Sequence, residues 1–252
     1  MGVDYRLTPY TTVGVAIADG ATNYGLSDGL GGGHGDMFQS AVYSMTRLNA
    51  AYVAAVLAFG WDRVSTSRSV TLAGVDTLTA DFSAYDFSGR IEGGYRFAIP
   101  GVYALPGFGV TPYGAFQMQA FHTPSYNESA AVGLPTFALA YNAQTTNTYR
   151  TELGTWFDDT IKLGHDASLS VWNRAAWAHD HWSSDSIAAS FQALPGSNFT
   201  VVGAPPAGDS LLASAGAGIF FRNGISLAAN FDTELTQRWQ VYSGTAWLRY
   251  AF

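Results

Sequence analysis

Apolar and polar residues alternate with a period of two along most of this chain. From Phe252 back to Tyr242, every second residue is apolar or glycine, and the residues between them include Arg249. Successive side chains of a β-strand point to opposite faces of a sheet, so this pattern predicts a C-terminal strand with one apolar face. The strand ends on an aromatic side chain, for which a membrane interface is a suitable environment.

The same alternation predicts about eleven strands. They are expected at residues 3–7, 11–18, 36–47, 51–61, 78–99, 110–122, 137–161, 168–179, 210–221, 225–234 and 238–252. Short turns are expected near Pro9, Asn49, Pro100, Gly164 and Asn223. Longer loops are expected near Gly31, Ser69, Asn127 and Ala193. Such alternation of short and long connections is typical of an antiparallel transmembrane β-barrel.

Charged residues gather on the polar faces of the expected strands. Arg90, Glu92 and Arg96, for example, share the face opposite Ile91 and Tyr95. Several charges on one face are costly to bury in a soluble core, but they are expected in the lumen of a barrel. There they brace the barrel as ion pairs, line a path for a threaded segment, or do both. The charges expected to face the lumen are Arg90, Glu92, Arg96, Arg150, Glu152, Arg174, Asp232, Glu234 and Arg249.

Composition agrees with a membrane barrel. Charged residues make up 12% of the 252 residues, about half the share in an average soluble domain, yet no apolar run reaches the roughly 20 residues of a membrane helix. The net charge of −7 argues against a nucleic-acid partner. Cysteine is absent, which excludes disulfides and cysteine-based metal sites. The first residues lack the regions of a signal peptide, so an export signal is expected upstream.

Two motifs invite a sharper interpretation. His179 and His181 flank Asp180 and lie close enough for a metal pair, but no third ligand is evident, so a polar loop at the outer end of a strand is expected. The glycine-rich run 31–36 lacks the ending of a phosphate-binding loop, and a flexible loop is expected there. No nucleophile elbow is present. We therefore expect no catalytic, cofactor or metal site.

Several short stretches occur in a characteristic order: residues 2–6, 29–33, 81–82, 89–96, 111–113, 121–124, 150–154, 176–180 and 250–252. In these the chain resembles the autotransporter β-domain, the C-terminal translocator of type V secretion, and especially its alphaproteobacterial versions. The resemblance covers essentially the whole chain. It implies a single twelve-stranded barrel domain over residues 1–252, with the first strand and a pore helix expected upstream.

The resemblance also implies a function and a set of partners. The implied function is export of an N-terminal passenger across the bacterial outer membrane, with no enzymatic activity and no cofactor. The implied partners are outer-membrane lipid, the barrel-assembly machinery and the passenger, around a monomeric barrel. Thr245, Tyr250 and Phe252 match the terminal signal for assembly, although Trp247 stands where the family often has glycine.

Other functions remain open from the sequence. One is a stand-alone outer-membrane barrel that acts as a pore, an adhesin or an omptin-like surface protease. Another is a soluble β-sandwich that binds a ligand. A long repetitive segment upstream would favour the translocator, and stability without detergent would favour the sandwich.

Overall fold

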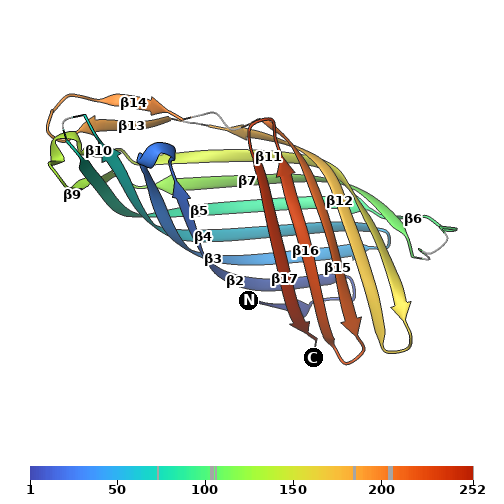
Figure 1. Ribbon diagram of the computed structural model, residues 1–252. Coiled ribbons are helices and arrows are strands. Elements are labelled where there is room, and N and C mark those ends of the chain that lie inside the picture. The colour runs from blue at the N-terminus through green and yellow to red at the C-terminus, as the bar shows by residue number, and fades with distance from the viewer. Residues whose placement is uncertain (73, 103–104, 106, 184–185, 204–206, 252) are drawn as a thin grey trace.

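The computed structural model describes the whole chain except residues 73, 103–104, 106, 184–185, 204–206 and 252. Its main feature is a long antiparallel sheet curled into a half-barrel (Figure 1). Neighbouring strands in this sheet follow the order of the chain. The strands along it are β1 (Gly2–Arg6), β2 (Thr11–Gly25), β3 (Gly31–Leu48), β4 (Ala51–Val70), β5 (Asp76–Tyr95), β7 (Gly109–Thr123), β11 (Gln144–Leu163), β12 (Ala167–Trp182), β15 (Asp209–Phe221), β16 (Ile225–Leu235) and β17 (Gln240–Tyr250).

The predicted antiparallel barrel-type sheet of about eleven strands is confirmed. The predicted loops near Gly31 and Ser69 are wrong. The strands β2 and β3 continue to Gly25 and from Gly31, joined by the short 3-10 turn η1 (Ser27–Gly29), and β4 continues to Val70. Glycine, serine and threonine hide the apolar alternation there, but the ladder bonds are made by the backbone. Gly33, for instance, pairs with Tyr24 on one side.

Two long connections form ordered structure at one end of the half-barrel. They contain β8 (Tyr126–Asn127), β9 (Ser129–Val132), η2 (Pro135–Phe137), β10 (Leu139–Tyr141), β13 (Ser186–Phe191) and β14 (Phe199–Val202). Four of these strands make a second sheet in the order β14-β13-β10-β8, which we call the cap (Figure 1). Over the described residues, the predicted polar loops 123–135 and 181–209 are therefore wrong, and residues 184–185 and 204–206 of the second loop lie outside the description. A single strand over 137–161 is also wrong, because β10 and β11 are separate strands.

Short connections lie at the opposite end, which we call the turn end. They include residues 7–10, 49–50, 164–166 and 222–224, and the connection between β5 and β7 carries the short strand β6 (Phe97–Ala98). Asn49, Gly164 and Gly224 adopt positive φ values of 57°, 69° and 87°, which tight turns require and which glycine and asparagine tolerate. The structure forms the turns that were predicted near Asn49, Gly164 and Asn223.

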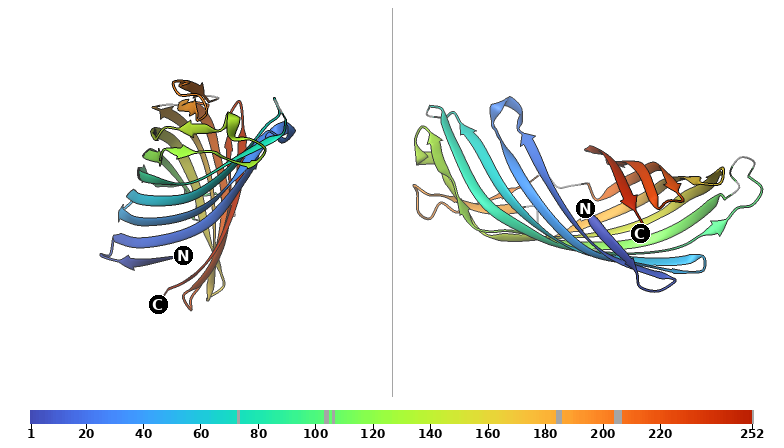
Figure 2. Two further views of the ribbon diagram at one scale, coloured as in Figure 1. Left: turned by 90° about the vertical axis from the view of Figure 1, so that its left-hand side faces the viewer. Right: turned by 90° about the horizontal axis from the view of Figure 1, so that it is seen from below.

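The two faces of the curled sheet have inverted burial. On β5, Tyr85, Phe87 and Ile91 are 47%, 56% and 53% exposed, whereas Asp86 on the other face is only 7% exposed. A soluble domain covers its apolar face and exposes its charges. The curvature visible in Figure 2 encloses the polar face and leaves the apolar face outside. No helix among the described residues is long and apolar enough to cross a bilayer.

The first and last strands of the sheet approach each other without a ladder between them in the described part of the chain. Their contact is an ion pair between Arg249 Nη2 and Asp4 Oδ1 at 2.8 Å. The strand β1 pairs with only residues 12–16 of β2. The exposed edge of β17 is therefore longer than the β1 edge that faces it. The two ends of the chain lie near each other in both views of Figure 2.

Aromatic rings on the polar face pack over glycines of the neighbouring strands. Tyr113 of β7 lies opposite Gly94 of β5 and Gly154 of β11 in the ladder. A Cβ added at Gly154 would lie 2.7 Å from Tyr113 Cε1 and 2.5 Å from Ala176 Cβ, and one added at Gly94 would lie 2.6 Å from Tyr52 Cε1. Non-bonded carbons need about 3.5–4.0 Å. The rings therefore occupy the space that a side chain at either glycine would need.

We predict that Gly154→Ala destabilises the folded sheet by about 1–3 kcal/mol, since the added methyl overpacks the contact with Tyr113. The matched control is Gly244→Ala on β17, where an added Cβ meets nothing within 4 Å. The measurement is urea unfolding in detergent micelles. Equal midpoints for the two variants would contradict the packing argument.

Candidate functional site

The nine charged residues predicted from the sequence all make ion pairs. The central group joins β5, β11 and β12 on the polar face. Arg90 binds Glu152 through two bonds, of 2.7 and 2.8 Å, and its Nη2 also lies 2.7 Å from Glu92 Oε2. Arg174 Nη1 lies 3.8 Å from Glu152 Oε2. Because β7 separates β5 from β11, the Arg90–Glu152 pair spans an intervening strand.

Hydroxyl and ring contacts complete this central group. The Glu152 side chain is 4% exposed, and its Oε2 accepts a bond from the Tyr113 hydroxyl at 3.2 Å. The Tyr52 hydroxyl donates to Glu92 at 2.6 Å. The guanidinium of Arg174 lies over the ring of Trp156, 5.3 Å from its centroid. A buried carboxylate is stable only when its charge and its lone pairs are satisfied, and Glu152 meets both conditions.

A second group is centred on Arg150 of β11. Its Nη2 lies 2.6 Å from Asp180 of β12 and 2.7 Å from Glu234 of β16. Strands in a sheet are about 4.8 Å apart, and β16 is three positions from β11. Side chains perpendicular to a flat sheet would not meet over that span. The curl brings them together, and the pair in turn holds the curl.

The other predicted charges, Arg96, Arg249 and Asp232, also lie in ion pairs. Arg96 Nη2 lies 2.7 Å from Asp158 at the turn end, and Arg249 binds Asp4 between the last and first strands. Arg174 Nη2 lies 4.0 Å from Asp232. Asp4, Asp158 and Asp180 were not predicted as partners. The period of two was a usable signal for Asp158, which lies at even spacing from Glu152.

A further ion pair, also absent from the sequence prediction, anchors the cap. Arg68 of β4 binds Glu128 through two bonds of 2.9 and 2.6 Å. Glu128 also accepts a bond from the backbone N–H of Leu139, which starts β10. Phe82 of β5 stacks on Tyr126 of β8, with ring centroids 4.1 Å apart. The cap is thus attached to the barrel sheet by a buried carboxylate and by aromatic packing.

The histidine motif lies within a strand. His179, Asp180 and His181 belong to β12, so the expected polar loop is wrong. The ladder partners of β11 hold the motif in extended form. Asp180 pairs with Arg150, and His179 Nδ1 lies 3.0 Å from Asp209 Oδ1. Among the described residues no group of three or more His, Cys, Asp or Glu side chains is arranged to hold a metal ion.

The proposed assembly signal falls on β17 and beyond. Thr245 and Tyr250 lie in β17 and are exposed. Trp247 packs against Trp172 of β12, with ring centroids 5.8 Å apart. Phe252 lies outside the described residues.

We predict that Arg90→Met destabilises the fold by about 3–5 kcal/mol, because it leaves the Glu152 carboxylate buried without its partner. Adding Glu152→Gln should recover part of this loss, since the uncompensated charge is then removed. Arg222→Met is the control, as this arginine lies in an exposed turn. Urea unfolding in micelles measures all three. A loss for Arg90→Met no larger than that of the control would refute the assignment.

We predict that the cap loosens above about pH 10. Burial raises the pKa of both Tyr126 and Tyr141 above its ordinary value. Because the pKa is higher in the folded than in the unfolded state, the stabilisation is fully present below about pH 10 and is lost as pH rises through the folded values. Tyrosinate absorbance should show phenols that titrate late in the folded chain but normally in denaturant. A Tyr141→Phe chain that keeps the whole late phase would contradict this.

Comparisons with known proteins agree with this geometry. A sequence model of the family described as "Autotransporter beta-domain" matches residues 1–232. The β domain of the Bordetella autotransporter BrkA superposes with a TM-score of 0.74 at 18% identity, covering 100% of this chain and 88% of that one. The translocator domain of autotransporter NalP from Neisseria meningitidis gives 0.72 at 17%, covering 100% and 79%. No curated protein matches. The two structures show a shared fold, and the family match shows that the chain belongs to the autotransporter beta-domain family.

Proposed function

We propose that this chain is a translocator barrel that inserts into the bacterial outer membrane and supports export of an N-terminal passenger segment. The observation that carries this proposal is the inverted burial of the curled sheet. Its outer face exposes large apolar side chains, and its inner face holds ion-paired charges. An apolar exterior suits lipid, and a polar interior suits a water-filled path. Family membership supports the same function.

The polar face is proposed to line the lumen. The Arg90 and Arg150 groups present charges and hydroxyls to the interior, and most of their hydrogen-bonding capacity is already used within the barrel. Such a surface would be hydrated and rigid, and it would bind a passing chain weakly because few of its donors and acceptors are free. The fixed ion pairs also keep the lumen open, because each cation is held against the barrel by its carboxylate. We infer that this lining, whose charges are already ion-paired, favours passage of the passenger through the lumen, and that passage needs no catalytic step by the barrel.

Closure of the barrel is proposed to need one more strand. Unpaired backbone groups in lipid cost several kcal/mol each, and β17 presents an edge longer than the five residues of β1. A strand from a preceding segment would pair with both edges and complete a monomeric barrel. A pore helix from the same segment would occupy the lumen.

Assembly is proposed to use the C-terminal strand. Thr245 and Tyr250 are exposed on β17, and Phe252 follows them. An exposed, regular edge strand is a template for pairing with another chain. The barrel-assembly machinery is the proposed reader of this strand, and outer-membrane lipid the proposed solvent of the finished barrel.

We predict that deleting Phe252 removes most of the heat-modifiable barrel from the outer membrane. The chain is expressed behind an export signal and a short reporter passenger, and membranes are assayed by unheated gel mobility. Phe252→Tyr is the control, which keeps a terminal aromatic side chain and should assemble normally. Wild-type levels after the deletion would contradict the role of this residue.

The same strain tests export. Protease added to intact cells should cleave the reporter when the barrel is assembled, and the reporter should stay protected when the cells carry the deletion. A correctly inserted barrel whose reporter is always protected would contradict the translocator function while leaving the membrane barrel intact. That result would favour the alternative function, a stand-alone outer-membrane barrel.

A further inference from the structure

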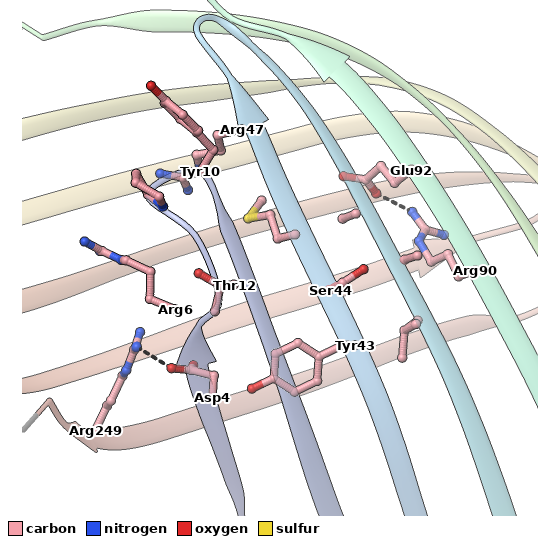
Figure 3. Close-up of a pocket in the computed structure, with 15 residues that line it drawn as sticks. Asp4, Arg6, Tyr10, Thr12, Tyr43, Ser44, Arg47, Arg90, Glu92 and Arg249 are labelled. Atoms are coloured by element: carbon pink, nitrogen blue, oxygen red, sulfur yellow. Dashed lines mark hydrogen bonds and ion pairs between the residues drawn. The ribbon is translucent and has the colours of Figure 1, made fainter.

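A cavity of about 630 Å³ lies on the inner face at the turn end (Figure 3). It is lined by residues of β1 to β5, by the first turn and by the end of β17. Its volume is in the range of small-molecule sites, about 300–1,000 Å³. Its charged lining residues are Asp4, Arg6, Arg47, Arg90, Glu92 and Arg249.

The charges around this cavity do not balance. Arg90 pairs with Glu92, and Arg249 pairs with Asp4. Among the residues that the structure places, neither Arg6 nor Arg47 has an ion-pair partner. The chain as a whole carries a net charge of −7, so this local excess of two positive charges runs against the overall composition.

The two unpaired arginines lie on the same side of the cavity. Arg6 is opposite Thr12 in the β1–β2 ladder, and Thr12 is opposite Met45 of β3, two residues before Arg47. The backbone N–H of Arg47 donates to the carbonyl of Tyr10 at 2.8 Å, which joins the end of β3 to the turn that follows Arg6. Figure 3 shows Arg6, Thr12, Tyr10 and Arg47 around one end of the cavity.

We propose that this cavity is a binding site for a phosphate group. Two guanidinium groups offer planar forks of donors that match phosphate oxygens, and the Thr12 hydroxyl adds a neutral donor beside Arg6. A phosphate monoester brings about −1.5 to −2 charge at pH 7 in one group, which offsets both arginines at once. A single carboxylate carries half of that charge. The site goes beyond the translocator function.

The test uses the refolded chain in a nonionic, phosphate-free detergent, with glycerol 3-phosphate as probe and calorimetry as readout. We expect saturable binding at one site per chain. Arg6→Gln and Arg47→Gln should each weaken it about tenfold or more, and the lysine variants should weaken it less, since they keep the charge and lose the fork. Arg222→Gln is the matched control, an arginine at the same end outside the cavity, and should bind like wild type. Unheated gel mobility verifies that each variant is folded.

Two further arms identify the source and the class of ligand. Micelles doped with phosphatidic acid, a lipid with the same phosphate ester, separate a headgroup site from a site for free phosphate compounds, and binding in either arm supports the proposal. Lowering the pH from 7.5 to 5 should weaken binding, because the ester becomes a monoanion (second pKa about 6) while arginine stays charged. Absence of saturable binding in both arms overturns the proposal. Equal binding of succinate, or equal affinity in Arg6→Gln, Arg47→Gln and wild type, overturns it as well.

Discussion

Ion pairs that reach over intervening strands are the constraint on which the rest of this structure depends. Arg90–Glu152 spans β7, and Arg150–Glu234 spans both β12 and β15. Each pair acts as a chord across the curve of the sheet. Backbone ladders fix only neighbouring strands, so they permit many radii of curvature, whereas a chord of fixed length permits few. Buried charges with one partner removed are costly, and the low exposure of Glu152 therefore makes its chord hard to break.

The inverted burial follows from the same constraint. Because the chords draw the polar face inward, the apolar side chains of β3 to β5 are turned outward, where water would not stabilise them. Such an exterior suits an apolar medium, in keeping with the proposed insertion into a membrane. The turn end and the cap end differ in structure. One carries tight turns with left-handed residues, and the other carries a second sheet held to β4 through Arg68 and Glu128.

Sequence reasoning reached the sheet and the charged face but not the cap. A period of two identifies strands whose faces differ in polarity, which is why Arg90, Glu152 and their neighbours were found. The period of two gives no signal where the side chains on both faces are small or polar, as in the Gly31–Asp36 run. It also gives none where strands have only two to six residues, as in the cap. It also cannot pair charges from distant strands. Glu128 and Arg68 meet only because β4 continues beyond its apolar segment, and no local signal marks that continuation.

The glycines beneath the aromatic rings also act as a check on register. Sliding one strand by two residues along its neighbour keeps every apolar side chain outside, so alternation alone does not exclude that error. Tyr113 does exclude it, because it is opposite a glycine on both sides. A slip by two at the β11 side would place its ring against Glu152 or Trp156 in place of Gly154. The glycines opposite Tyr113 thus make a two-residue slip sterically unfavourable, so the smallest side chain helps to specify the alignment of the strands.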